Sequence, residues 1–90
     1  MLTSAERKAL KAKAHKLDPV VHIGAKGLTD EVMAEIDRAL RAHELIKVRA
    51  GSMERDQRDA ALASICEKTR AEQVQQVGKV FVLFRKNIDE

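Results

Sequence analysis

Two glycines enclose a short loop that carries one lysine, and this loop is the part of the sequence best suited to hold a phosphate group. Gly24 and Gly27 lie on either side of Ala25 and Lys26. Because glycine has no Cβ, the backbone can adopt positive φ at either glycine and come close to a ligand. Lys26 supplies the only charge of the four residues. They therefore form a candidate anion-binding loop.

The residues around this loop indicate how it is positioned. Residues 20–23 are apolar apart from His22, and this short β-branched run is typical of a strand. Thr29 can cap a following helix, and Asp30 and Glu31 suit the positive end of that helix. KH modules use a G-x-x-G loop between such elements to clamp a nucleic-acid backbone. Ordinary tight turns contain the same four-letter pattern, so the motif alone leaves both interpretations open.

The basic residues are concentrated near the start of the chain. Residues 1–28 hold six basic and two acidic residues, a balance of +4, whereas the remainder holds 11 basic and 12 acidic residues, a balance of −1. Lys8, Lys11 and His15 follow helical spacing along one side of a predicted first helix. Lys47 and Arg49 share one face of a predicted strand. Such a surface suits a polyanionic partner, although a lysine row is also typical of a solvated helix face.

The apolar periodicity predicts the remaining elements. Thr3 and Glu6 form a candidate capping box for the first helix, which extends to about residue 16. Two further helices are predicted at residues 30–43 and about 53–70. Strands are predicted at residues 20–23, 45–50, 73–77 and 79–85, and the last two form a hairpin at Gly78. Residues 80–84 form the most apolar run and are expected in the middle of the sheet.

This order of elements predicts the fold class. Two strand-helix-strand crossovers place their helices on one face of a mixed four-stranded sheet. We therefore expect an α/β (α+β) two-layer sandwich, with an N-terminal helix followed by the order β-α-β-α-β-β. The opposite face of the sheet is then open to the first helix or to a partner.

Length and composition narrow the class of protein. Ninety residues correspond to a single domain, expected over residues 1–90, and no apolar run reaches the length of a membrane span. No secretory signal is recognisable at the N-terminus, so we expect a cytoplasmic location without membrane contact. The single Cys66 excludes an intramolecular disulfide and a thiolate pair for zinc, and its spacing indicates a half-buried, unreactive thiol. We expect a monomer without a cofactor.

The histidines do not form a recognisable catalytic group. His15, His22 and His43 fall on the first predicted helix, the first predicted strand and the apolar face of the second predicted helix. No serine, paired carboxylates or metal ligands accompany them at a catalytic spacing. We therefore do not expect an enzyme. His22 alternates with two apolar neighbours, so it is either a structural strand residue or, beside the loop, a contact to RNA.

Taken together, these segments resemble the CRM domain (chloroplast RNA splicing and ribosome maturation), whose stand-alone bacterial members are the YhbY-type RNA-binding proteins. The resemblance covers nearly the whole chain. It depends on the basic first helix, GAKGLT at residues 24–29, AHELIKV at 42–48 and VGKVFVLFR at 77–85. Members often have lysine directly after the first glycine and tyrosine before the final arginine, whereas this chain has Ala25 and Phe84.

The resemblance implies a fold like the C-terminal domain of translation initiation factor 3 and association with precursors of the large ribosomal subunit. RNA, including ribosomal RNA, is thus the expected partner, and ribosomal proteins are further candidate partners. With two phenylalanines and no Trp or Tyr, the chain suits recognition of phosphate geometry more than base stacking. The expected RNA-binding residues are Gly24, Ala25, Lys26, Gly27, Lys8, Lys11, Lys47, Arg49 and His22.

An alternative is a protein-protein adaptor on ribosome-assembly particles with little RNA affinity of its own. In that case the open face of the sheet and the third helix would contact protein. Asp56, Asp59 and Glu67 are candidate interface residues, although acidic residues in this arrangement are also typical of a solvated helix face.

Overall fold

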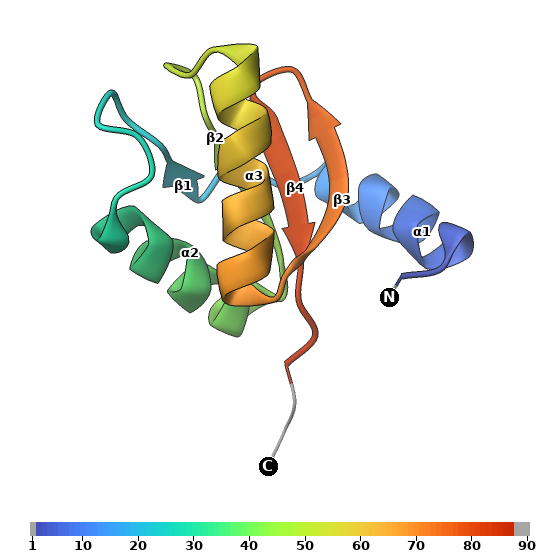
Figure 1. Ribbon diagram of the computed structural model, residues 1–90. Helices are drawn as coiled ribbons and strands as arrows, with labels where there is room; N and C mark the ends of the chain where they lie inside the picture. Colours follow the sequence, from blue (N-terminus) through green and yellow to red (C-terminus); the bar gives the residue numbers. More distant parts are fainter. Residues whose placement is uncertain (1, 88–90) are drawn as a thin grey trace.

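The computed structural model describes residues 2–87, which form three helices and four strands in the predicted order (Figure 1). The elements are α1 (Ser4–Ala14), β1 (Val21–His22), α2 (Asp30–His43), β2 (Leu45–Arg49), α3 (Arg55–Thr69), β3 (Glu72–Val77) and β4 (Val80–Phe84). Within this described part of the chain, the helices are too short and too polar to span a membrane.

The four strands form one mixed sheet in the order β1-β2-β4-β3. β1 pairs with β2 in parallel, whereas β4 pairs antiparallel with both β2 and β3. β2 and β3 consequently run in the same direction, so each of α2 and α3 connects two parallel strands. The predicted mixed sheet, terminal hairpin and central position of residues 80–84 are confirmed.

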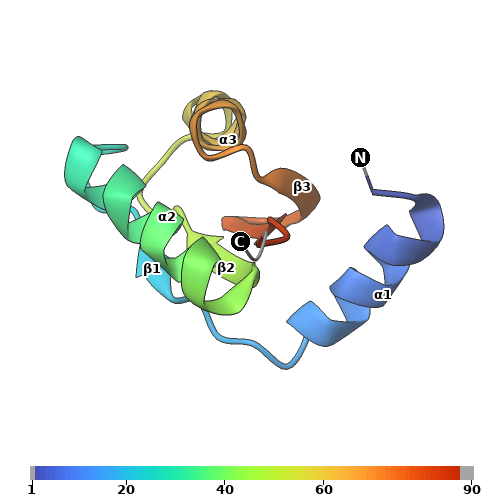
Figure 2. The same cartoon turned by 90° about the horizontal axis from the view of Figure 1, so that it is seen from below.

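Two apolar clusters lie on opposite faces of the sheet. The larger cluster joins α2 and α3 to one face, and Ile36, Leu40 and Phe81 in it have no exposed surface. The smaller cluster joins α1 to the other face and contains Ala14, Val74 and Val82 among its fully buried residues. Figure 2 shows α3 and α1 on opposite sides of the sheet. Because α1 is a single helix of 11 residues, it covers only part of its face.

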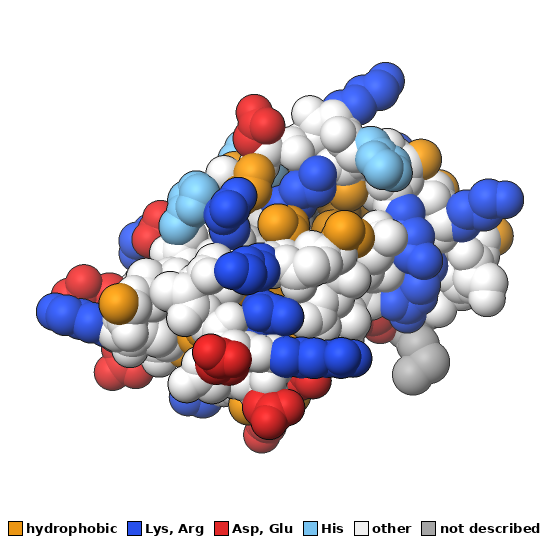
Figure 3. Space-filling model, turned by 90° about the horizontal axis from the view of Figure 1, so that it is seen from above, with side chains coloured by type: hydrophobic (Ala, Val, Ile, Leu, Met, Phe, Trp, Pro, Cys, Tyr) orange, Lys and Arg blue, Asp and Glu red, His pale blue; other side chains and the backbone are white. Residues whose placement is uncertain are grey.

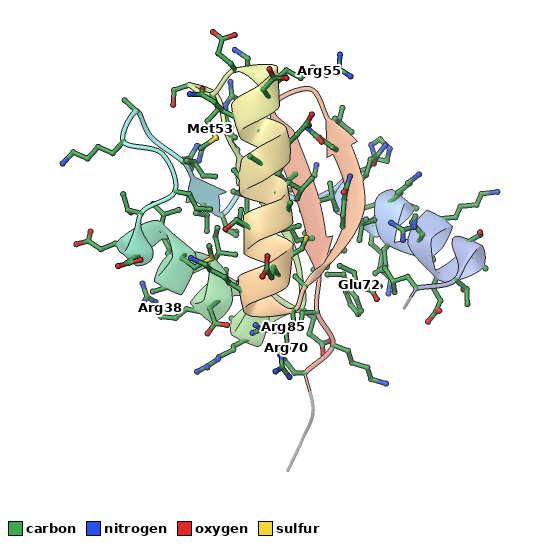
Figure 4. All side chains as sticks on the ribbon, viewed as in Figure 1. Arg38, Met53, Arg55, Arg70, Glu72 and Arg85 are labelled. Carbon is green, nitrogen blue, oxygen red and sulfur yellow. The ribbon has the colours of Figure 1, made fainter. Side chains whose placement is uncertain are left out.

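Hydrogen bonds cap the start of α1 and also hold this helix at the β3 side of the sheet. The Thr3 hydroxyl accepts a hydrogen bond from the Glu6 amide at 3.1 Å, and the Glu6 carboxylate accepts one from the Thr3 amide at 2.9 Å, which confirms the predicted capping box. The Leu2 amide donates to the Glu72 carboxylate at 2.8 Å (Figure 4), and Arg7 donates to the carbonyl of Gln73. The contacts of Leu2 and Arg7 fix one end of α1 against β3.

Several strand ends differ by one residue from the sequence-based expectations, and three details of the helices also differ. α1 ends at Ala14, two residues before the predicted end. α3 begins at Arg55 rather than near residue 53, because residues 50–53 form a turn that the Met53 amide closes on the Ala50 carbonyl at 3.3 Å. His43 was expected on the apolar side of α2 but is exposed. It is the last residue of that helix, so no further turn follows to cover it.

Candidate functional site

The loop between β1 and α2, called here the G-x-x-G loop (residues 24–27), is a tight turn with an exposed tip. The Gly27 amide donates to the Gly24 carbonyl at 3.0 Å, which places Ala25 and Lys26 at the two central positions of a β-turn. Gly27 has a φ of +78°, whereas Gly24 is outside the positive-φ region. The backbone conformation therefore requires glycine at Gly27 and not at Gly24.

The base of the G-x-x-G loop is fixed on both sides. The Ile23 amide donates to the Arg49 carbonyl at 2.8 Å, so the strand pairing continues to the residue before the loop. On the other side, the Thr29 hydroxyl caps α2 by accepting from the Val32 amide at 3.2 Å. Met53 lies beside the loop (Figure 4), and its Cε would be 3.9 Å from a Cβ added at Gly27. A Cβ added at Gly24 would meet no atom within 4 Å, so the space in front of Gly24 is open to a ligand.

This difference between the two glycines gives a testable prediction. We expect Gly27→Ala to lower the free energy of unfolding by about 1 kcal/mol, because alanine is strained at positive φ. Gly24→Ala is the matched control, and it should change stability by less than about 0.5 kcal/mol because its Cβ meets nothing. Urea unfolding followed by circular dichroism measures both values. Equal losses in the two variants would contradict the difference in loop conformation.

The face of the sheet that α2 and α3 leave open carries a row of four side chains. His22 pairs with Arg49, Arg49 with Val80, and Val80 with Val77. Directly paired residues point to the same face of a sheet, and the alternate residues of these strands are buried on the other face. His22, Arg49 and Val77 are exposed and Val80 is half-buried. The row thus combines cationic and apolar surface.

A groove of about 440 Å³, called here the basic groove, lies between this face of the sheet and the end of α1. Basic side chains and valines predominate in its lining, and Asp18 is its only acidic residue. The lining consists of Lys11, Ala14, His15, Leu17, Asp18, Pro19, Lys47, Arg49, Gln75, Val77, Val80 and Val82. In Figure 3, which views the molecule from above, blue and pale-blue side chains lie around patches of orange apolar surface.

The predicted site residues fall into three places. Lys11, Lys47 and Arg49 line the basic groove, and His22 is the paired neighbour of Arg49 at its edge. Lys26 is exposed on the G-x-x-G loop, which begins two residues after His22. Lys8 is exposed on α1 but does not line the basic groove.

Several residues of the basic groove were not among the expected RNA-binding residues. His15 follows Lys11 by one helical turn, and the sequence had placed it in the same basic row without naming it as a binding residue. Val77 and Val80 gave no comparable signal, because their position depends on the pairing of the hairpin with β2.

Outside the basic groove, the described residues offer little catalytic chemistry. They contain no group of three or more His, Cys, Asp or Glu side chains that could hold a metal ion. Cys66 is half-buried, and burial raises the pKa of its thiol, so the nucleophilic thiolate is disfavoured. The arrangement supplies positive charge, open backbone and apolar surface, which are the properties of a binding site.

Comparison with known proteins places these features in a family. The CRS1/YhbY (CRM) domain matches residues 2–85. A probable RNA-binding protein from Pseudomonas aeruginosa is 44% identical over 86 residues, which are 96% of this chain and 83% of that protein. An RNA-binding protein from Haemophilus influenzae is 43% identical over 84 residues, covering 93% of this chain and 85% of that protein.

A solved structure has the same fold. The solution structure of a hypothetical Staphylococcus aureus protein is similar with a TM-score of 0.85 and 32% identity, covering 99% of this chain and 93% of that chain. The match to the domain covers more than nine-tenths of the described residues and agrees with the family that the sequence motifs indicated. The chain belongs to the CRS1/YhbY (CRM) domain family.

Proposed function

We propose that this protein binds RNA without catalysing a reaction, and that its target is precursor RNA of the large ribosomal subunit. The observation that carries the proposal is the grouping of Lys11, Lys47 and Arg49 around one groove, with the G-x-x-G loop directly after the neighbouring strand. A relative from one bacterium is named as an RNA-binding protein, and relatives from two others are named as probable RNA-binding proteins. The family resemblance supports the ribosomal target.

The two parts of the surface make different contributions to binding. In the G-x-x-G loop, the open space at Gly24 lets a phosphate approach the backbone, and Lys26 supplies the charge that holds it. The cations of the basic groove strengthen binding and make it depend on salt, because each phosphate that they neutralise releases counterions. No Phe, Tyr or Trp is among the described residues that line the basic groove, so base stacking on these rings does not contribute there.

The first test is binding of a fluorescent fragment of large-subunit ribosomal RNA over a series of salt concentrations. We expect the native protein to bind with an affinity that falls steeply with salt. Lys26→Glu should weaken binding about 10-fold, because it replaces a cation by an anion at the tip of the G-x-x-G loop. Lys8→Glu combined with Lys11→Glu should weaken binding and flatten the salt dependence.

Lys68→Glu is the matched control for the loop variant. Lys68 is exposed in the last turn of α3, on the side of the sheet opposite to the basic groove, and its replacement changes the net charge equally. We expect this variant to bind RNA within about twofold of the native protein. Weak binding that none of these substitutions changes would overturn the phosphate-binding mechanism. That result would favour an adaptor that contacts ribosomal proteins instead.

A further inference from the structure

The base of the basic groove has a property that phosphate binding does not require. Val77, the last residue of β3, is 55% exposed, and Val80, which pairs with it, is half-buried. Leu17, 37% exposed, faces the same groove from the segment after α1. Exposed apolar side chains that are grouped within a concave, cationic surface indicate a ligand with both apolar and anionic parts.

RNA has this combination only where its bases are unpaired. In a duplex the flat faces of the bases are stacked on one another, and the outer surface consists of phosphates and ribose. In a single strand the faces are accessible and can pack against apolar side chains while the phosphates contact cations. Lys47 and Arg49 lie on β2 directly beside the hairpin that carries Val77 and Val80. Charge and apolar surface are thus within reach of the same nucleotide.

The size and position of the basic groove agree with this ligand. Its volume of about 440 Å³ is within the range of sites that hold small molecules, and it is too small to enclose a double helix. Its edge, at His22, is two residues from the G-x-x-G loop. A single strand seated in the basic groove can therefore continue across His22 to Lys26.

We propose that the basic groove binds unpaired nucleotides, with base faces on Val77 and Val80 and phosphates on Lys47 and Arg49. This inference rests on the proposed function and adds to it a preference for single-stranded over fully paired RNA. Aliphatic side chains contact the base faces and make no hydrogen bonds to base edges, so the preference concerns pairing state and not base sequence.

The test compares a single-stranded RNA with a blunt-ended RNA duplex of the same length, using residues 1–90 and both RNAs over the same salt series. We expect the native protein to bind the single strand at least about fivefold more tightly. Val77→Thr combined with Val80→Thr keeps side-chain shape and net charge but makes the base of the groove polar. This variant should lose most of the preference while binding the duplex as the native protein does.

Val20→Thr is the matched control, because Val20 is 46% exposed and lines a different pocket, formed with α1 and the end of α2. It should keep the preference. A second measurement needs no variant: a single strand containing 4-thiouridine, irradiated on the native protein, should cross-link to the peptide that carries β3 and β4.

The outcomes separate the two proposals. Equal binding of the two RNAs, or cross-links only to segments outside the basic groove, would overturn this inference while leaving RNA binding intact. Failure to bind either RNA would overturn the proposed function and this inference with it. A loss of preference in Val20→Thr equal to that in the double variant would also overturn the assignment to the basic groove.

Discussion

Replacing Lys47 and Arg49 together by glutamate is expected to weaken RNA binding about 100-fold at about 0.1 M salt. Both residues lie on the open face of β2 and line the basic groove, so the change converts its most cationic wall into an anionic one. Because two phosphate contacts are lost, the slope of log affinity against log salt should become shallower by about 1.4. A fluorescence titration at several salt concentrations measures both effects.

The control for this double variant changes the net charge by the same amount, but on the opposite side of the sheet. Arg38 on α2 and Lys68 on α3 are exposed and belong to the two helices that cover the other face (Arg38 is labelled in Figure 4). Arg38→Glu combined with Lys68→Glu should reduce affinity only about twofold, through the change in overall charge. If both double variants weaken binding equally, the attraction depends on net charge and the basic groove is not the binding surface.

The fold was predictable because its strongest signals are local. Residues 46–50 alternate between apolar and charged side chains, and the structure buries Ile46, Val48 and Ala50 while leaving Arg49 exposed. The apolar run at residues 80–84 can be covered on both faces only in the middle of a sheet, and β4 is found there. The end of α2 was also predicted at His43, but the sequence did not indicate that its side chain would be exposed.

The candidate site was only partly predictable, because it depends on contacts between distant residues. Helical spacing and strand alternation grouped Lys8 with Lys11 and Lys47 with Arg49. The basic groove itself requires the docking of α1 near β3 and the register of β4 with β2, which no local pattern specifies. A shift in the pairing of β3 with β4, between Gln73 and Gln75, further decides which β3 side chains face the groove.

The conformation of the G-x-x-G loop illustrates the same limit. The sequence identified both glycines as positions where positive φ was possible, and only the structure separates their roles. Gly27 has φ of +78° because the chain must turn from the β-turn into the cap of α2. Gly24 has a φ outside the positive region and open space in front of it. Its lack of a side chain therefore leaves the backbone accessible to a ligand.

The second large effect is expected at Arg85, where Arg85→Met should lower the free energy of unfolding by about 2 kcal/mol. The Arg85 guanidinium donates to the Asp37 carboxylate at 2.7 Å and to the Thr69 carbonyl at 2.9 Å, so it joins the residue after β4 to α2 and α3 (Figure 4). Only 18% of the Arg85 side chain is exposed. Methionine keeps an apolar stem but leaves both acceptors without this donor. Thermal unfolding should show a midpoint about 10 °C lower.

Arg41→Met is the control, because Arg41 pairs with the same carboxylate at 3.1 Å but 74% of its side chain is exposed. Arg41→Met should lower the free energy of unfolding by less than about 0.5 kcal/mol.

Acid provides the second control, since hydrogen bonding from Arg85 holds the pKa of Asp37 below its usual value. The stability that this pair supplies is therefore complete above about pH 4 and is lost as the pH falls through the lowered pKa. Urea unfolding of the native protein and Arg85→Met at pH 7 and at about pH 2 should give a large difference at pH 7 and a smaller one in acid. An unchanged difference would show that Arg85 stabilises the fold by packing and by its bond to Thr69, not by its charge pairing with Asp37.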